Sequence, residues 1–197
     1  INAESDIYFI HLDKDGKVSF RADGKAVSTR SGLKENPIAV VDPSGNSLVM
    51  WKGRDKKNNQ ELFIQKLTKN GLRLWQNEGI QLTDNKFEKI DFALKVDKRG
   101  YSHISFICKS PAASNKYSVR YQILTPNGKV LSDSLKGIMF SSNNSMSEAE
   151  IIPDNKGGST IFWLQNQNKK TVLFCQFIDS TGSKRWGKNP IAISKSN

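Results

Sequence analysis

The chain has 197 residues, of which 37% are apolar, 25% charged and 9% aromatic, a composition typical of a folded protein rather than a disordered one. Its 30 Lys and Arg against 19 Asp and Glu give a formal net charge of +11, and no apolar run approaches the roughly 20 residues of a membrane-spanning helix. The two cysteines, Cys108 and Cys175, lack the C-x-x-C spacing of a metal or redox site and exclude a disulfide framework.

One sequence unit recurs about every 55 residues and is the strongest pattern in the chain. In its first half an apolar stretch ends in Asp, then come a turn Gly and a large aromatic residue, as in Asp42, Gly45, Trp51; Asp97, Gly100, Phe106; and Asp154, Gly157, Trp163. In its second half Gln precedes a turn Gly and an aromatic residue, fully in Gln65, Gly71, Trp75 and Gln176, Gly182, Trp186, and partly in Gln122, Gly128 and Ile10, Gly16, Phe20. Alternating apolar residues between such turns predict an antiparallel meander of about four strands per unit.

In chain order, residues 1–29 supply only the last two strands of a unit, while 30–83, 84–141 and 142–197 each supply a whole unit. A single four-stranded meander leaves one apolar face bare, so neighbouring units must stack on one another. We therefore predict an all-β, β-propeller-like array of four-stranded antiparallel blades, about three and a half repeats that together form one partial propeller domain. Such a number cannot close a ring. Our hypothesis is that the missing blades come from a longer parent chain or from another chain.

The most conspicuous residues of the repeat have structural interpretations. Asp42, Asp97 and Asp154 each precede a turn Gly and are expected to cap their own hairpins, although they are also carboxylates at a shared position. The recurring Trp residues suit packing between sheets better than the stacking of sugars. The LDKDGK segment around Asp13 lacks the remaining ligands of a calcium loop, which favours a hairpin turn.

No sequence motif of catalysis is recognisable. His11 and His103 are the only histidines, and neither has a nucleophile or carboxylate at a recognised spacing. The chain also contains no phosphate-binding loop and no zinc-binding helix motif. From this we expect that the protein is not an enzyme and that it has no cofactor and no metal site.

The loops between the second and third strands of each unit are rich in basic residues. Loops at one end of a rigid scaffold are where binding usually occurs, and a positive set attracts an acidic partner such as a protein or an anionic glycan. A solvated rim without function is the competing interpretation. Nucleic acid is not expected, because arginines and aromatic residues are not interleaved. The predicted ligand-binding residues are Lys52, Arg54, Lys56, Lys57, Lys109, Lys116, Lys169 and Lys170.

The repeat resembles the propeller-type repeats of large secreted and surface proteins of Bacteroidetes. Their usual W-x-D-x-R element is kept only loosely here, by Trp51, Gly53, Arg54 and Asp55. The resemblance implies an exported protein of the extracellular space, cell surface or periplasm, since such repeats occur in adhesins, with components of type IX secretion and beside catalytic domains. We therefore expect a non-catalytic binding or assembly module that displays basic loops. The alternative is the ancillary or catalytic propeller portion of a carbohydrate-active enzyme.

Overall fold

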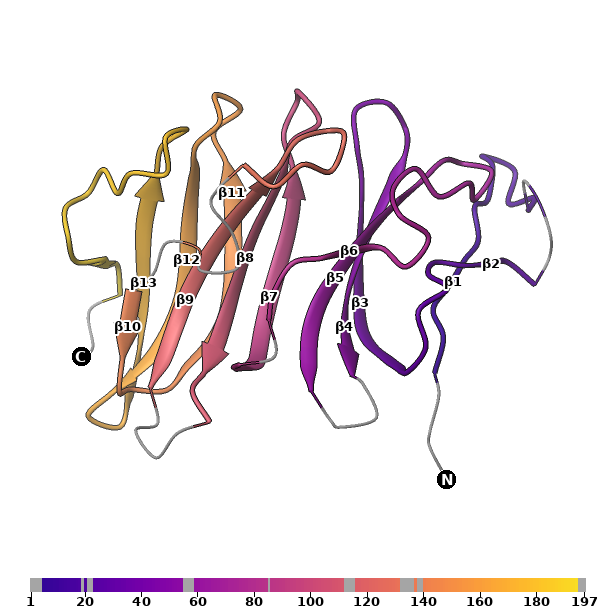
Figure 1. Cartoon of the computed structure of the whole chain (residues 1–197). Helices are drawn as coiled ribbons and strands as arrows, with labels where there is room; N and C mark the ends of the chain where they lie inside the picture. Colours follow the sequence, from indigo (N-terminus) through magenta and orange to yellow (C-terminus); the bar gives the residue numbers. More distant parts are fainter. Residues whose placement is uncertain are drawn as a thin grey trace. The chain divides into compact units, whose positions relative to one another are not determined.

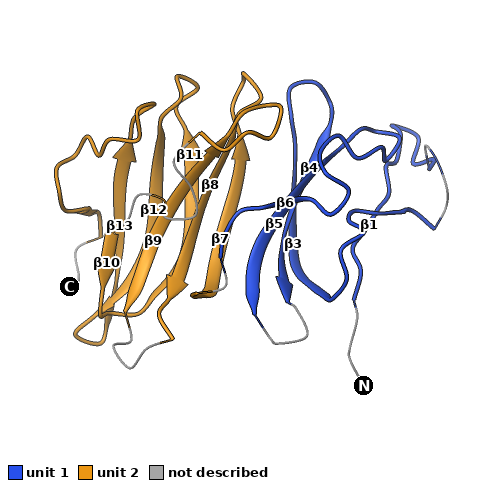
Figure 2. Ribbon diagram, viewed as in Figure 1, with its two compact units in different colours: residues 1–85 blue, residues 86–197 orange. Residues whose placement is uncertain are grey.

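The computed structural model describes residues 5–18, 20, 23–54, 59–84, 86–111, 116–131, 137 and 140–194. Their regular structure consists of β-strands, which confirms the prediction of an all-β fold. Within these ranges there is no helix that is long and apolar enough to cross a membrane. Contacts divide the chain into two compact units, residues 1–85 and 86–197, coloured separately in Figure 2.

Unit 1 contains one short and one full sheet (Figure 1). The short sheet pairs β1 (Tyr8–Phe9) with β2 (Lys25–Ala26). The full sheet is an antiparallel meander of β3 (Leu33–Val41), β4 (Ser47–Arg54), β5 (Gln60–Leu67) and β6 (Ile80–Gln81), in that order. The core of the unit consists of Val27, Val49, Trp51, Phe63 and Leu67, with Ile7 and Phe9 of the short sheet packed against them. The two sheets of unit 1 therefore share one apolar core.

Unit 2 contains two full sheets, each an antiparallel meander. The first comprises β7 (Glu88–Val96), β8 (Ser102–Lys109), β9 (Tyr117–Leu124) and β10 (Phe140–Ser142). The second comprises β11 (Met146–Pro153), β12 (Ser159–Gln167), β13 (Lys170–Ile178) and β14 (Ile191–Ala192). The sheets stack face to face (Figure 1), and Ile107, Val119 and Tyr121 of the first meet Ile151, Trp163 and Phe174 of the second in one core.

The recurring Asp residues cap their own turns, as predicted. One carboxylate oxygen of each accepts hydrogen bonds from the backbone N–H groups two and four residues later, at distances of 2.7 to 3.0 Å. The turn glycines that follow, such as Gly45 with φ of 79°, have a left-handed backbone that other residues adopt at a cost. The Asp13 segment forms the same turn, with Asp13 Oδ1 accepting from the N–H groups of Asp15 and Lys17. The predicted caps are Asp42, Asp97 and Asp154, and Asp179 caps a fourth turn in the same way.

The large aromatic residue after the first turn lies in the core, as predicted. Trp51 and Trp163 are 0% and 1% exposed. The ring of Trp163 lies between the sheets of unit 2, 5.6 Å from Phe140 and 6.0 Å from Phe174 between centroids. Rings of this size fill the space between stacked sheets, so these two tryptophans are not platforms for sugars. The same prediction was wrong for Trp186, which follows the second turn of its repeat and is 42% exposed.

The three four-stranded meanders are consistent with a propeller-like arrangement, and none of the described sheets closes into a ring. The number of blades stays a prediction. So does the grouping of 1–29, 30–83, 84–141 and 142–197 into one partial propeller domain.

Candidate functional site

The largest of the polar hollows described lies in unit 1, where the short sheet meets the segment before β3. We call it the unit 1 pocket. Its volume of about 410 Å³ is within the range of roughly 300–1,000 Å³ typical of small-molecule sites. A carboxylate, three hydroxyl groups, a guanidinium and an ammonium line it. The lining residues are Asp6, Ala26, Ser28, Thr29, Arg30, Ser31, Gly32 and Lys34.

Fixed hydrogen bonds shape this pocket. Ser28 Oγ donates to the carbonyl of Glu78 at 2.8 Å and accepts from Arg30 N–H at 3.0 Å. Ser5 Oγ accepts from the N–H of Lys34 and donates to its carbonyl. The lining segment is thereby held to the rest of unit 1, while the side chains of Thr29 and Ser31 stay exposed to solvent.

The cations of the unit 1 pocket already have acidic partners. Lys34 Nζ lies 2.6 Å from Asp6 Oδ1, and Arg30 lies 3.4 Å from a carboxylate oxygen of Glu78 and 3.8 Å from one of Glu61. Arg30 also stacks on the ring of Phe63 at 4.3 Å. The pocket therefore offers many donors and acceptors without an excess of positive charge.

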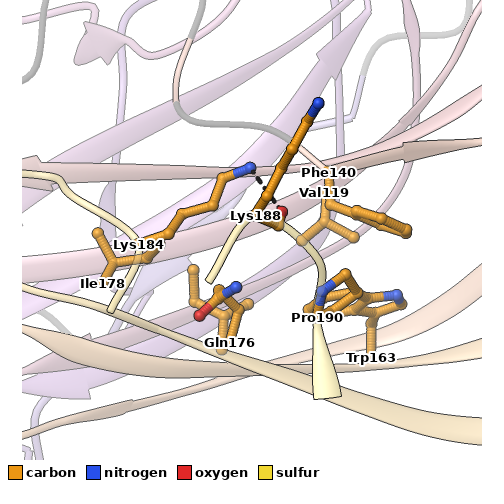
Figure 3. Close-up of a pocket in the computed structure, with 9 residues that line it drawn as sticks. Val119, Phe140, Trp163, Gln176, Ile178, Lys184, Lys188 and Pro190 are labelled. Carbon is orange, nitrogen blue, oxygen red and sulfur yellow. Dashed lines mark hydrogen bonds between the residues drawn. The ribbon is translucent and has the colours of Figure 1, made fainter. Parts of the chain in front are cut away.

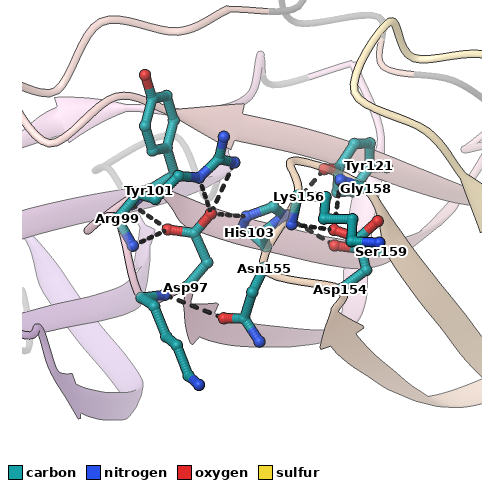
Figure 4. Close-up of polar contacts among 11 residues, drawn as sticks. Asp97, Arg99, Tyr101, His103, Tyr121, Asp154, Asn155, Lys156, Gly158 and Ser159 are labelled. Atoms are coloured by element: carbon teal, nitrogen blue, oxygen red, sulfur yellow. Dashed lines mark hydrogen bonds and ion pairs between the residues drawn. The ribbon is translucent and has the colours of Figure 1, made fainter.

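A second polar cluster lies in unit 2, where the two sheets meet (Figure 4). Ser159 Oγ of β12 is 2.7 Å from His103 Nδ1 of β8, and the Tyr121 hydroxyl of β9 is 3.0 Å from the same nitrogen. His103 Nε2 faces Asp97 Oδ2 at 3.5 Å, and Arg99 donates to that oxygen at 2.9 Å. The side chains of His103 and Asp97 are both 0% exposed.

Burial sets the protonation of this cluster. Desolvation lowers the pKa of His103 from its ordinary value of 6.5, although the Asp97 carboxylate works to raise it. For Asp97 burial works to raise the pKa, but hydrogen bonds from Tyr101 and Arg99 lower it overall. Burial raises the pKa of Tyr121 to about 12. The histidine is therefore neutral at pH 7, beside an ionised aspartate and an un-ionised tyrosine.

Ser159, His103 and Asp97 have the order of a nucleophile, base and carboxylate, which is the arrangement of serine hydrolases. Such a nucleophile must also reach a substrate atom at about 3 Å. Ser159 and His103 are each 0% exposed as whole residues, so a substrate does not reach the hydroxyl in this structure. The cluster instead ties the two sheets of unit 2 together, because its members come from both.

An apolar pocket lies beside the core between the two sheets of unit 2 (Figure 3). Its volume is about 20 Å³, which leaves room for little more than one water molecule. Lys184 and Lys188 stand over it, and Lys184 Nζ donates to the carbonyl of Lys188 at 3.4 Å. The remaining lining residues are Val119, Phe140, Ile161, Trp163, Gln176, Ile178 and Pro190.

The basic residues predicted to bind a ligand divide between the units. In unit 1, Lys52 Nζ and Arg54 Nη2 share Glu35 Oε2, at 3.9 and 3.2 Å. Lys56 and Lys57 lie outside the described residues. Their role as ligand-binding residues stays a prediction.

In unit 2, Lys109 Nζ lies 5.7 Å over the Tyr117 ring, and Lys116, Lys169 and Lys170 are exposed. The β8–β9 and β12–β13 connections that carry these lysines lie at the same end of unit 2 in Figure 1. They too stay predicted ligand-binding residues.

Neither the unit 1 pocket nor the His103 cluster could be predicted from the sequence. Ser159 is 56 residues from His103, and Glu78 is 48 residues from Arg30. The first pair joins different repeats and the second joins the two ends of one repeat, so no local spacing marks either pair. Sequence reasoning singled out two members of the cluster. Asp97 was predicted to be a turn cap, which it also is, and His103 was noted as a histidine without a catalytic partner at a recognised spacing.

No family model and no curated protein sequence matches the chain. Among solved structures, the endo-arabinase from Bacteroides thetaiotaomicron VPI-5482 is similar, with a TM-score of 0.42 and 13% identity over 82% of this chain and 62% of that one. That protein is an enzyme, which contradicts our expectation that this chain is not one, and the expectation is withdrawn. We had relied on missing local motifs, whereas groups that act together in a repeat protein come from distant repeats. The similarity gives no support to the predicted link with adhesins or type IX secretion.

Proposed function

We propose that the chain is the propeller-like portion of a carbohydrate-active enzyme outside the cytoplasm, and that its unit 1 pocket binds a glycan. The chemistry of this pocket carries the proposal. Hydroxyl, carboxylate and guanidinium groups over about 410 Å³ are the donors and acceptors that a polyhydroxyl ligand requires. The groups available to the glycan are the Asp6 carboxylate, whose side chain is about half exposed, and the exposed hydroxyls of Thr29 and Ser31.

The charges of the pocket favour a neutral stretch of glycan. An acidic ligand would have to compete with Asp6 for Lys34 and with Glu61 and Glu78 for Arg30. A neutral sugar hydroxyl avoids this competition, because it can donate to a carboxylate and accept from a guanidinium without separating the ion pairs. The fixed segment around Ser28 needs little ordering on binding, which favours affinity.

Attraction of an acidic partner by the basic loops is a second candidate. The observation that favours it is confined to unit 2, where Lys116, Lys169 and Lys170 are exposed at one end of the sheets. In unit 1 the shared Glu35 offsets the charge of Lys52 and Arg54.

Calorimetric titration of the chain with neutral gluco-, xylo-, manno- and arabino-oligosaccharides, and with an acidic polysaccharide, tests the proposal. The same panel is incubated with the chain and assayed for new reducing ends. Thr29→Trp and Ser31→Trp each place a large ring in the pocket from an exposed position. Ser44→Trp makes the same change at an exposed turn of unit 1 outside it.

We expect one neutral class to bind and both pocket variants to weaken it at least tenfold, while Ser44→Trp binds like wild type. Equal binding by Thr29→Trp, Ser31→Trp and wild type would overturn the assignment of the pocket. Binding of the acidic polysaccharide alone, lost on changing Lys116 and Lys169 to Glu, would favour the second candidate instead.

A further inference from the structure

In the second sheet of unit 2, one face has no other described sheet packed on it, and at its edge the ring of Trp186 lies 5.9 Å from that of Phe177 between centroids. Successive side chains of β12 point to opposite faces of the sheet. Ile161 and Trp163 point toward β7–β10 and are buried in the core, whereas Phe162 and Leu164 point away and are partly exposed. Isoleucines at both edges of this face are 58% and 46% exposed. We call this the outer face, and its residues are Ile152, Phe162, Leu164, Leu173, Phe177 and Ile191.

In the first sheet of unit 2 the corresponding face is covered. By position in the repeat, Leu164 corresponds to Ile107 and Leu173 to Val119. Each of these is paired across the same two strands, Leu164 with Leu173 and Ile107 with Val119. Ile107 and Val119 are 0% and 4% exposed because the second sheet packs on them. The outer face thus continues a stacking interface that the chain already uses once.

The complementary face belongs to the short sheet of unit 1 and to the Leu12–Val18 bridge that follows β1, and no described sheet of unit 1 packs on it. Ile7 and Phe9 pack into the core of unit 1, and the alternate side chains point the other way. Those are 39% to 59% exposed. We call this the leading face, and its residues are Tyr8, Ile10, Leu12 and Val18.

The leading face corresponds to the surface that β13 turns toward the first sheet of unit 2. By position in the repeat, Tyr8 corresponds to Phe174 and Leu12 to Ile178. Both Phe174 and Ile178 are buried in the core between the two sheets. A leading face laid on an outer face would therefore repeat the contact between β11–β14 and β7–β10.

We propose that a second copy of this chain covers the outer face with its leading face, in a head-to-tail contact. The two faces differ and belong to the same polypeptide, so each copy offers one of each, and the contact propagates to further copies or closes into a ring. The outer face is four strands wide, but the leading face is about two strands wide, roughly 10 by 26 Å from standard strand spacings. The contact then buries roughly 500 Å² in total, which is less than a stable complex buries and is in the range of weak contacts. Association is therefore expected only at concentrations of about 100 μM and above.

Sedimentation velocity at rising concentrations, up to about 1 mM, tests the proposal on the whole chain. Ile152→Glu puts a charge on the outer face, and Tyr8→Glu puts one on the leading face. Val41→Glu is the matched control, because Val41 is 66% exposed and belongs to neither face. All three positions are exposed, so folding is expected to persist, and circular dichroism verifies it.

We expect wild type and Val41→Glu to associate and each face variant alone to stay monomeric. The decisive sample mixes the two face variants. The Ile152→Glu copy keeps a sound leading face and the Tyr8→Glu copy a sound outer face, so the mixture should form dimers and nothing larger. A monomeric wild type, association that survives both changes, or a mixture that stays monomeric would each overturn the proposal.

Discussion

His103 shows how one buried side chain can couple the stacking of two sheets to pH. Its ring contacts Ser159 and Tyr121 through Nδ1 and faces Asp97 through Nε2. Protonation would put a second donor on Nδ1, where the two hydroxyls lie, and would charge a ring with no exposed surface. Since desolvation lowers the pKa of His103 below 6.5, the unfolded chain takes up this proton more readily than the folded one.

The stability that His103 contributes is therefore complete above pH 6.5 and is lost as the pH falls below that value. We expect the free energy of unfolding to fall between about pH 7 and pH 5, by at most about 1.4 kcal/mol per pH unit from this group. His103→Gln should be less stable than wild type at pH 7 but should lose less on acidification. Urea unfolding at several pH values measures both. The lowered pKa of Asp97 acts separately, below its ordinary value of 3.8. Parallel pH profiles for variant and wild type would contradict this role.

Turns and strands are the elements that sequence reasoning predicted best, because both depend on local chemistry. Asp42 and Gly45 mark a hairpin through bonds within five residues, and the alternating exposure from Ile38 to Val41 marks β3 through its own side chains. The unit 1 pocket and the His103 cluster escaped prediction for the opposite reason. Their groups meet only after separate strands have stacked, and the sequence does not record that geometry.

A Gly stands ahead of the fourth strand in three of the repeats, as Gly24, Gly79 and Gly137, and the structure gives a reason for it at Gly79. At Gly79 a Cβ atom would lie 2.7 Å from the ring of Trp51 and 3.0 Å from the carbonyl oxygen of Ile64. At Gly45 the backbone is similarly left-handed, but a Cβ would meet nothing within 4 Å. Comparing Gly45 with Gly79 therefore distinguishes the free-energy cost of a left-handed backbone from the cost of steric crowding.

Gly45→Ala should destabilise unit 1 by about 1 kcal/mol through the left-handed backbone alone. Gly79→Ala should cost a further 1 to 3 kcal/mol, roughly, because the core around Trp51 must shift to admit the methyl group. Denaturant unfolding followed by tryptophan fluorescence compares the two variants. Equal losses of stability would show that the close approach of strand and ring has no energetic importance.

On the scale of the whole molecule, the net charge of +11 acts in opposite directions on the two kinds of association considered. Like charges repel two copies of the chain, whereas the contact between outer and leading faces is apolar. The exposed lysines of unit 2 instead attract a polyanion. Salt screens both effects, since the Debye length falls from about 10 Å at 0.1 M to about 3 Å at 1 M.

Raising the salt concentration from about 0.1 M to about 1 M should therefore strengthen self-association several-fold while weakening the binding of an acidic polysaccharide. Binding of a neutral oligosaccharide in the unit 1 pocket should change little, because the ligand carries no charge. Sedimentation velocity measures the self-association, and calorimetric titration measures the binding of the acidic polysaccharide and of the neutral oligosaccharide, all on the same preparation. If self-association weakened with salt, ionic contacts rather than Tyr8, Phe162 and their apolar neighbours would hold the copies together, and the head-to-tail contact would be wrong.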